Sequence, residues 1–250
     1  MIAPELVANF NKPVRVEKYF PGPADLDAKG ALQTAFHDRA AAATRRQFGR
    51  AVFVRAVVEV SNFCRENCAY CGMRRDNRTL KRFRAQPEKL AELLLQHRPA
   101  SVTDINIQAG EDPVAVREIV LPLIRALRRE TSLGISVCLG TLAPELYTEL
   151  QAAGASIYII KFEIGNAVQY KQFEAPGSFG ERLRHIRLLA ENGWNVSSGF
   201  IAGLPGQTPE DLLKNFAVAR SLPLAGCSVS PFIPGNETPL SDASPANSNW

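Results

Sequence analysis

The chain has 250 residues, 46% of them hydrophobic, which is enough for one sizeable α/β domain rather than several small ones. The net charge is +4, from 29 basic and 25 acidic residues that are interspersed, and this mild balance does not indicate nucleic-acid binding. No apolar run approaches the roughly 20 residues of a membrane span, and the N-terminus lacks a basic-then-apolar signal segment. We therefore expect a cytoplasmic protein that contacts neither membranes nor nucleic acid.

Short runs rich in Val and Ile alternate with amphipathic helical patterns, which is typical of repeated βα units and a parallel sheet. We expect strands at 53–60, 103–108, 133–139, 156–164, 195–201 and 226–231. We expect helices at 24–47, 87–97, 114–130, 143–153, 179–192 and 209–220. Three helix starts carry capping signals, namely Asp112 before Pro113, Ser178 with Glu181 three residues later, and Thr208 before Pro209.

At least six βα units predict an α/β fold of the TIM-type (β/α) barrel class, or an open part of one, with its chemistry at the carboxyl ends of the strands. We divide the chain into an N-terminal helical extension over 1–50, the barrel over 51–240 and a polar loop or tail over 241–250. The tail resembles a loop that is cut before its next element. We therefore expect the chain to be truncated before the last strands of a closed barrel; the alternative is a natural open barrel of six strands.

Three cysteines, Cys64, Cys68 and Cys71, form the spacing CxxxCxxC after the first expected strand. Thiolates are soft ligands suited to iron–sulfur clusters, and this spacing allows three of them to hold three irons of a cubane. The fourth iron is then open to a small chelating molecule, which favours catalysis over electron storage. The alternative is a structural zinc site, which needs a closed set of four ligands. No second CxxC knuckle supplies them, because the other candidates are the scattered Cys138, Cys227, His37, His97 and His185.

Polar residues alternate with apolar ones in several expected strands, so they share one face of the sheet. They are Arg55 and Glu59 in the first strand, Asp104, Asn106 and Gln108 in the second, and Lys161 and Glu163 in the fourth. Charges inside a barrel are costly without partners or a ligand. We therefore favour a hydrated lumen for a polar small-molecule substrate; the alternative is that Arg55, Glu59, Asp104 and Lys161 pair with one another across it.

Two basic runs, Arg74-Arg75 and Lys81-Arg82-Phe83-Arg84, follow the cysteines. The simpler interpretation is a solvated surface. The alternative is that they raise the local electrostatic potential for anionic ligands.

The CxxxCxxC motif, with the aromatic Tyr70 before its last cysteine, resembles the signature of the radical S-adenosylmethionine (SAM) superfamily. Within that superfamily, residues 50–240 resemble the HydE-type FeFe-hydrogenase maturases, in a branch that also contains biotin synthase and methylornithine synthase. The resemblance rests on the runs CRENCAYCGMRRDNRTLKRFR, IQAGEDP, SFGERL, SGFIAGLPGQT and SPFIPGNETPL. It implies a 4Fe-4S cluster on the three cysteines and S-adenosyl-L-methionine bound at the open iron, where it is reductively cleaved to start radical chemistry.

The resemblance also implies roles for residues at the barrel rim. Gly110 and Glu111 would receive the methionine amino group of SAM, and Glu163 its ribose or amine. Arg182 would bind the methionine carboxylate, for which a guanidinium fork is suited. Ile201 would contact the adenine.

The implied partners are a small substrate in the barrel lumen, an external one-electron reductant and hydrogenase-maturation proteins. Lys161-Phe162 precede Glu163 where the maturases have an Arg-His pair, so the substrate stays open. One alternative is a methylornithine-synthase-like or other radical SAM enzyme acting on a small amino-acid-derived substrate. An alternative of another class is a non-catalytic iron–sulfur or zinc binding module.

Overall fold

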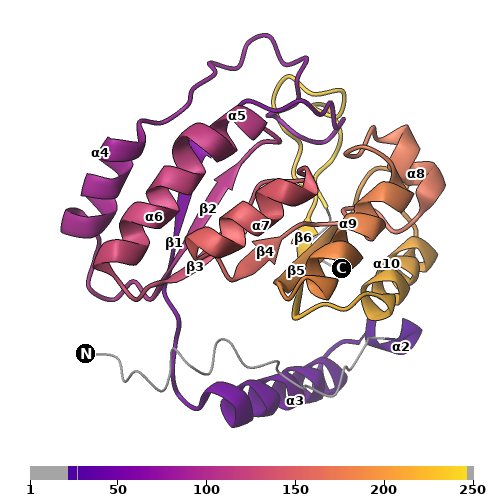
Figure 1. Ribbon diagram of the computed structural model, residues 1–250. Coiled ribbons are helices and arrows are strands. Elements are labelled where there is room, and N and C mark those ends of the chain that lie inside the picture. Colours follow the sequence, from indigo (N-terminus) through magenta and orange to yellow (C-terminus); the bar gives the residue numbers. More distant parts are fainter. Residues whose placement is uncertain (1–21, 27, 247–250) are drawn as a thin grey trace.

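The computed structural model describes residues 22–26 and 28–246, which form a curved parallel sheet with helices along its outer face (Figure 1). The sheet has the order β1-β2-β3-β4-β5-β6. Its strands are β1 Arg55–Ser61, β2 Asp104–Ala109, β3 Gly134–Cys138, β4 Ile157–Ile159, β5 Asn195–Ala202 and β6 Gly226–Pro231. The helices are α2 Pro23–Leu26, α3 Ala31–Phe48, α4 Pro87–Glu92, α5 Pro113–Ala115, α6 Leu121–Glu130, α7 Pro144–Ala153, α8 Ala167–Gln172, α9 Phe179–Glu191 and α10 Pro209–Ser221. Two π-helical stretches, η1 Leu93–His97 and η2 Val116–Val120, continue α4 and α5.

The six βα units confirm the predicted barrel class, and in the described residues the sheet is open, with β1 and β6 as its two edges. The register aligns Val57 with Asn106 and Glu59 with Gln108, so the polar faces of β1 and β2 lie on the same side. The opposite face packs under the helices, where Ile105, Ile107 and Tyr158 are fully buried. The alternation read from the sequence therefore separates core from lumen as expected.

Two expected elements are wrong in their extent. The fourth strand was expected to run over 156–164, but the regular strand ends at Ile159, and Glu163 has φ 62, which L-residues adopt only at a cost. The chain nevertheless stays beside β5, because the Glu163 N–H donates to Gly199 O at 3.0 Å and Glu163 O accepts from Ile201 N at 2.9 Å.

The expected N-terminal helix over 24–47 is two helices, α2 and α3, because Gly30 has φ 58 at the start of α3 and breaks the continuity. α3 buries none of its residues. Residues 1–21 of the predicted extension and 247–250 of the predicted tail lie outside the described residues. No helix among the described residues is long and apolar enough to cross a membrane.

The capping signals place the helix starts correctly, although their contacts differ. Thr208 forms a full capping box with Asp211, and the Ser178 hydroxyl accepts from Glu181 N. Asp112 lies at the N-cap of α5, where its carboxylate is engaged by Ser61 and Arg84. The short helix α8 was not expected from the sequence. The side chain of Asn166 caps it by accepting from the N–H groups of Val168 and Gln169.

Candidate functional site

The three cysteines lie on the loop that follows β1 and are close enough to influence one another. Burial raises the pKa of the Cys68 thiol, and the thiols of Cys71 and Cys64 raise it further. Burial is also the main cause of the raised pKa of Cys71. Among the residues that the structure describes, no three His, Cys, Asp or Glu side chains converge as they would around a single metal ion.

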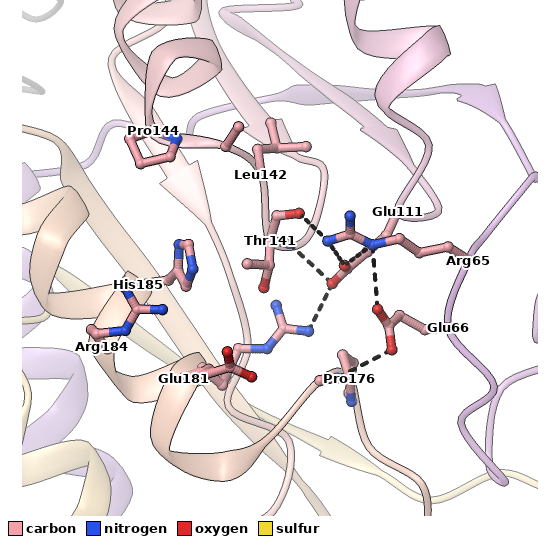
Figure 2. Close-up of a pocket in the computed structure, with 13 residues that line it drawn as sticks. Arg65, Glu66, Glu111, Thr141, Leu142, Pro144, Pro176, Glu181, Arg184 and His185 are labelled. Atoms are coloured by element: carbon pink, nitrogen blue, oxygen red, sulfur yellow. Dashed lines mark hydrogen bonds and ion pairs between the residues drawn. The ribbon is translucent and has the colours of Figure 1, made fainter.

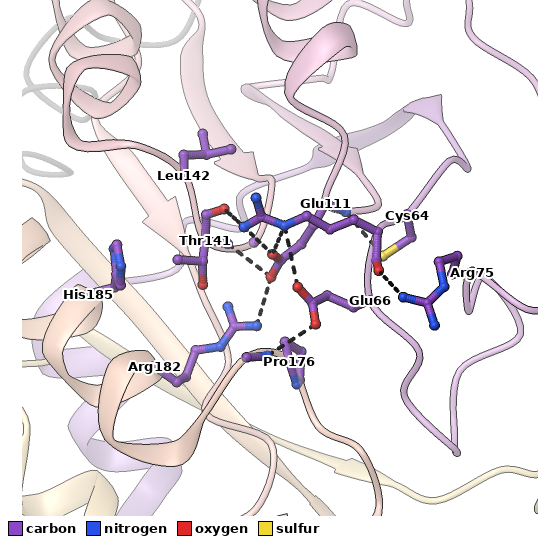
Figure 3. Close-up of polar contacts among 12 residues, drawn as sticks. Cys64, Glu66, Arg75, Glu111, Thr141, Leu142, Pro176, Arg182 and His185 are labelled. Atoms are coloured by element: carbon purple, nitrogen blue, oxygen red, sulfur yellow. Dashed lines mark hydrogen bonds and ion pairs between the residues drawn. The ribbon is translucent and has the colours of Figure 1, made fainter. Parts of the chain in front are cut away.

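The end of β2 is pressed against this loop at Gly110. A Cβ on Gly110 would lie 2.3 Å from Phe63 O and 2.8 Å from Cys64 Cβ, so only glycine fits. The next residue, Glu111, donates its N–H to Cys64 Sγ at 3.4 Å, and its carbonyl accepts from Arg65 N at 3.2 Å (Figure 3). Gly110 therefore brings the backbone of Glu111 beside the first cysteine.

The carboxylate of Glu111 is buried and accepts hydrogen bonds from three directions. Arg182 Nη2 donates to Glu111 Oε1 at 2.8 Å, and Thr141 N donates to the same oxygen at 3.0 Å (Figure 3). Arg65 Nη2 donates to Glu111 Oε2 at 3.0 Å. Arg182 is only 3% exposed; burial lowers its pKa, but Glu111 and Tyr170 raise it by more, so the guanidinium stays charged. Glu111 and Arg182, which were predicted to contact different groups of SAM and are 71 residues apart, thus form one buried ion pair.

A pocket of about 390 Å³ opens beside this ion pair (Figure 2). Its walls come from the cysteine loop, the loop after β3 and the first turns of α9. The lining residues include Arg65, Glu111, Thr141, Arg182 and His185. His185 Nδ1 lies 3.0 Å from the hydroxyl of Tyr147, which also accepts from Leu142 N at 2.9 Å. Burial lowers the pKa of His185, so the imidazole is held neutral.

Glu163 and Tyr70 lie near the cysteines on the other side of the loop. Burial raises the pKa of Tyr70, and the carboxylate of Glu163 raises it further, as it also does for Cys68 and Cys71. Lys161 Nζ is 3.1 Å from Glu163 Oε2. Ile201, the predicted adenine contact, is 8% exposed and packs in a small apolar cluster with Ala69, Leu204 and Phe232, against which Tyr70 is also packed.

Three buried polar atoms of the predicted site residues lack a partner in ordinary hydrogen-bond geometry in the described structure: Tyr70 Oη, which interacts with the Cys68 thiol, Glu163 Oε2 and Arg182 Nε. Glu163 Oε2 has the ammonium of Lys161 nearby, but in a geometry that does not qualify as a hydrogen bond. Buried polar atoms in native structures normally have a partner, and one without is explained by a ligand, an ion or water. These atoms surround the cysteine loop, where a bound molecule would satisfy them.

The polar lumen face is largely paired. Arg55 binds Asp104, Gln108 Nε2 donates to Glu59 at 2.9 Å, and Ser136 Oγ donates to Asn106 at 3.0 Å. Lys161 Nζ donates to Ser230 Oγ at 3.3 Å in addition to its ion pair with Glu163. The pairing of lumen charges, which was the alternative to the favoured hydrated lumen, therefore occurs in part: Arg55 pairs with Asp104 and Lys161 with Glu163, whereas Glu59 accepts from Gln108.

Three further residues shape the site and were not predicted from the sequence: Arg65, Gly140 and Thr141. Arg65 links Glu111 to the loop after β3, because its Nη2 also donates to Thr141 O at 2.8 Å. Gly140 has φ 69, and a Cβ there would come within 2.1 Å of the Glu111 side chain. A glycine at the end of an expected strand was the one signal in the sequence that pointed to this position.

The family model described as the radical SAM superfamily matches residues 58–218, which is more than half of the chain and includes the three cysteines, Glu111, Glu163, Arg182 and Ile201. This chain belongs to the radical SAM superfamily. Members of the superfamily use a 4Fe-4S cluster and S-adenosyl-L-methionine. The three neighbouring thiols and the unpartnered buried atoms around them fit that pair of cofactors.

The similarity extends to individual proteins of the superfamily. The [FeFe] hydrogenase maturase subunit HydE of Thermotoga maritima is 33% identical over 198 residues, covering 79% of this chain and 57% of the relative. The 3-methylornithine synthase of Methanosarcina acetivorans is 25% identical over 195 residues, covering 77% of this chain and 55% of the relative. This radical SAM chain thus spans little more than half the length of these curated relatives.

Solved structures agree with the fold. Methylornithine synthase superimposes with a TM-score of 0.80 at 21% identity, over 98% of this chain and 72% of that one. The FeFe-hydrogenase maturase HydG from Carboxydothermus hydrogenoformans superimposes with a TM-score of 0.76 at 23% identity, over 90% of this chain and 54% of that one. At these identities the superpositions establish the radical SAM barrel, not a shared substrate.

Proposed function

We propose that this chain forms the SAM-cleaving barrel of a HydE-like radical SAM enzyme that acts in maturation of the FeFe-hydrogenase active-site cluster. The observation that supports it best is the meeting of Cys64, Glu111 and Arg182 at one rim of the barrel, within a region 33% identical to a hydrogenase maturase. When bound, the cluster and SAM supply one-electron cleavage of a carbon–sulfur bond. The substrate is a small molecule in the lumen, and the electron comes from an external reductant.

In this proposal the residues of the chain bind and orient the cofactors. Cys64, Cys68 and Cys71 are the thiolate ligands, and Gly110 allows the Glu111 backbone to lie against the first of them. Arg182, whose Nη2 is bound to Glu111, would offer its unpartnered Nε to the carboxylate of the methionine moiety, and Glu111 would accept from the amine. Glu163, Tyr70 and Ile201 line the side expected to face the ribose and adenine.

A second candidate is an enzyme of the methylornithine-synthase type, acting on a small amino-acid-derived substrate. It is favoured by the similarity to 3-methylornithine synthase and by Lys161 in the lumen, where the ammonium contacts Ser230 and Glu163. Assaying 3-methylornithine formation from a mixture of amino acids tests it directly.

We place either activity in the cytoplasm, because Cys64, Cys68, Cys71, Cys138 and Cys227 are all free thiols, as a reducing compartment keeps them.

The experiment that tests the first proposal is anaerobic reconstitution with iron and sulfide, followed by metal analysis and a SAM-cleavage assay under reduction. We expect Ala substitution of Cys64, Cys68 or Cys71 to abolish iron binding and SAM cleavage, whereas Cys138→Ala and Cys227→Ala retain both. A bound zinc ion instead of iron, or a cluster without SAM cleavage, would support the non-catalytic binding module.

A second experiment separates SAM binding from cluster binding. Arg182→Ala should weaken SAM binding by about 1–3 kcal/mol, the range for a lost charge-assisted hydrogen bond, with the iron content unchanged. Arg184→Ala is the matched control, since Arg184 lines the same pocket two residues along α9 but is exposed. Equal SAM dissociation constants for the wild type and Arg182→Ala would show that Arg182 has another role.

A further inference from the structure

The basic run Lys81-Arg82-Phe83-Arg84 lies against the base of the cysteine loop. An antiparallel bridge joins Ser61 to Arg84, and flanking hydrogen bonds run from Asn62 N to Phe83 O at 3.3 Å and from Ala85 N to Val60 O at 2.8 Å. Residues 62–83 therefore form a closed loop with a narrow neck. The three cysteines lie inside it.

Arg82 is located at this neck, and its guanidinium extends across the loop. Nη1 donates to Asn62 O at 2.5 Å, next to the neck, and to Met73 O at 2.9 Å on the far side. Nη2 donates to Arg74 O at 2.6 Å, with longer contacts to Asn77 O at 3.4 Å. One side chain thus joins the two sides of the loop through backbone carbonyls.

We infer that Arg82 is a positioning residue that holds the cysteine loop in its cluster-binding shape before the cluster is present. The inference rests on the cluster-binding part of the proposed function. It assigns the basic run a role in ordering the loop, which neither a solvated surface nor a general attraction for anions describes.

The chemistry of arginine suits this role. A loop of this length carries many carbonyl groups outside any regular element, and buried ones need donors. Arginine offers several N–H donors in a rigid planar fork, whereas lysine offers three from one rotating nitrogen and does not reach separated acceptors at the same time. The cation also lies near the thiol of Cys71, whose pKa burial raises and Arg82 lowers slightly.

Arg84 holds the same neck from outside the loop. Its Nε and Nη2 donate to the two carboxylate oxygens of Asp112 at 2.7 and 3.0 Å, and the guanidinium lies 4.3 Å from the centre of the Phe63 ring. The neck is thereby attached to the start of α5. The loop is thus anchored from outside by Arg84 and ordered from within by Arg82, so loosening of the loop interior can be measured without releasing the neck.

The test compares the wild-type chain with Arg82→Lys, which keeps the charge, and Arg82→Met, which removes it. Arg78→Lys is the matched control, because Arg78 is an exposed cation of the same loop. Two quantities are measured: hydrogen–deuterium exchange over 62–77 in the metal-free chain, with β2–β5 as an internal reference, and the rate at which a chelator removes iron from the reconstituted chain.

We expect both Arg82 variants to exchange about tenfold faster over 62–77 and to lose iron about tenfold faster, since several hydrogen bonds are lost together. Arg78→Lys should match the wild type. Unchanged local exchange in both Arg82 variants overturns the inference, as does an equal rise in β2–β5, which would show general destabilisation. If the wild type binds no cluster, the proposed function fails, while the exchange comparison still decides the role of Arg82.

Discussion

Gly140 illustrates how one missing side chain defines the site. Its φ of 69 and the proximity of the Glu111 side chain leave no room for a Cβ. The next residue, Thr141, uses its backbone N–H to hold the same carboxylate. The position of Glu111 therefore depends on the backbone of a neighbouring loop as much as on its ion pair with Arg182.

We predict that Gly140→Ala displaces the Glu111 carboxylate and weakens SAM binding by about tenfold or more, as expected for the loss of at least one hydrogen bond. Gly206→Ala is the control: Gly206 has φ 75, but a Cβ there meets nothing within 4 Å. Both variants carry the backbone strain of a left-handed alanine, about 1–2 kcal/mol. Titration with SAM measures the effect of displacing Glu111, and denaturant unfolding measures the backbone strain. Equal SAM affinity in both variants would contradict the role given to Gly140.

At the scale of elements, the start of α10 is tied to α8 through Asp211. Its carboxylate accepts from Asn166 Nδ2 at 3.0 Å and from Gln169 Nε2 at 2.9 Å, and it completes the capping box with Thr208. The hydrogen bond from Asn166 is the main cause of a pKa lowered to about 2 for Asp211. One carboxylate thus secures two neighbouring helices.

The lowered pKa of Asp211 predicts a pH-dependent contribution to stability. The unfolded group titrates near its ordinary value of about 4, so the contribution is complete above that pH and is lost as the pH falls towards 2. Asp211→Asn should lower the free energy of unfolding at pH 7 and flatten its fall between pH 4 and 2. Denaturant unfolding at several pH values measures this, with the exposed Asp242→Asn as control. If the free energy of unfolding of Asp211→Asn falls between pH 4 and 2 as steeply as that of the wild type, the prediction is wrong.

The elements that could be predicted are those whose patterns are local. Val and Ile runs located all six strands, and the Pro-marked starts located α5 and α10 correctly. The helix α8 escaped because it is six residues long and marked only by Asn166. The fourth strand was drawn too long because the left-handed conformation of Glu163 is imposed by its hydrogen bonds to β5 and has no signal in the sequence.

For the whole molecule, the open sheet leaves β1 and β6 with one strand neighbour each among the described residues. Exposed apolar side chains accompany these edges, with Val57 58% and Val229 50% exposed. Unpaired edges that also carry apolar residues favour association with other chains. The chain should therefore be prone to self-association.

We predict that residues 1–250 associate in a concentration-dependent way, and that Val229→Lys reduces this by placing a charge on the edge strand β6. Sedimentation velocity over a range of concentrations measures it. Val168→Lys is the control, because Val168 is 76% exposed but lies on the helix α8 and not on an edge strand. Association that is equally sensitive to both substitutions would point to general surface hydrophobicity.

The candidate site was predictable where it depends on the order of the barrel. The cysteines and Glu111 follow neighbouring strands, so the parallel sheet brings them to one rim. Arg182 was placed by resemblance, and its buried partner confirms only that it belongs at that rim. Arg65 and Thr141 were not predictable, because their contacts with Glu111 join loops that are distant in sequence.

The left-handed backbone of Glu163 has a consequence for how this chain can change. A non-glycine residue in that conformation costs of order 1–3 kcal/mol, and it persists here because both its N–H and its carbonyl are held by β5. Substitutions that relax the turn, such as asparagine or glycine, are thus open to any lineage that no longer needs this carboxylate. Relatives of this fold that have lost the cofactor should carry such residues at this position, and their barrels should be the more heat-resistant for it.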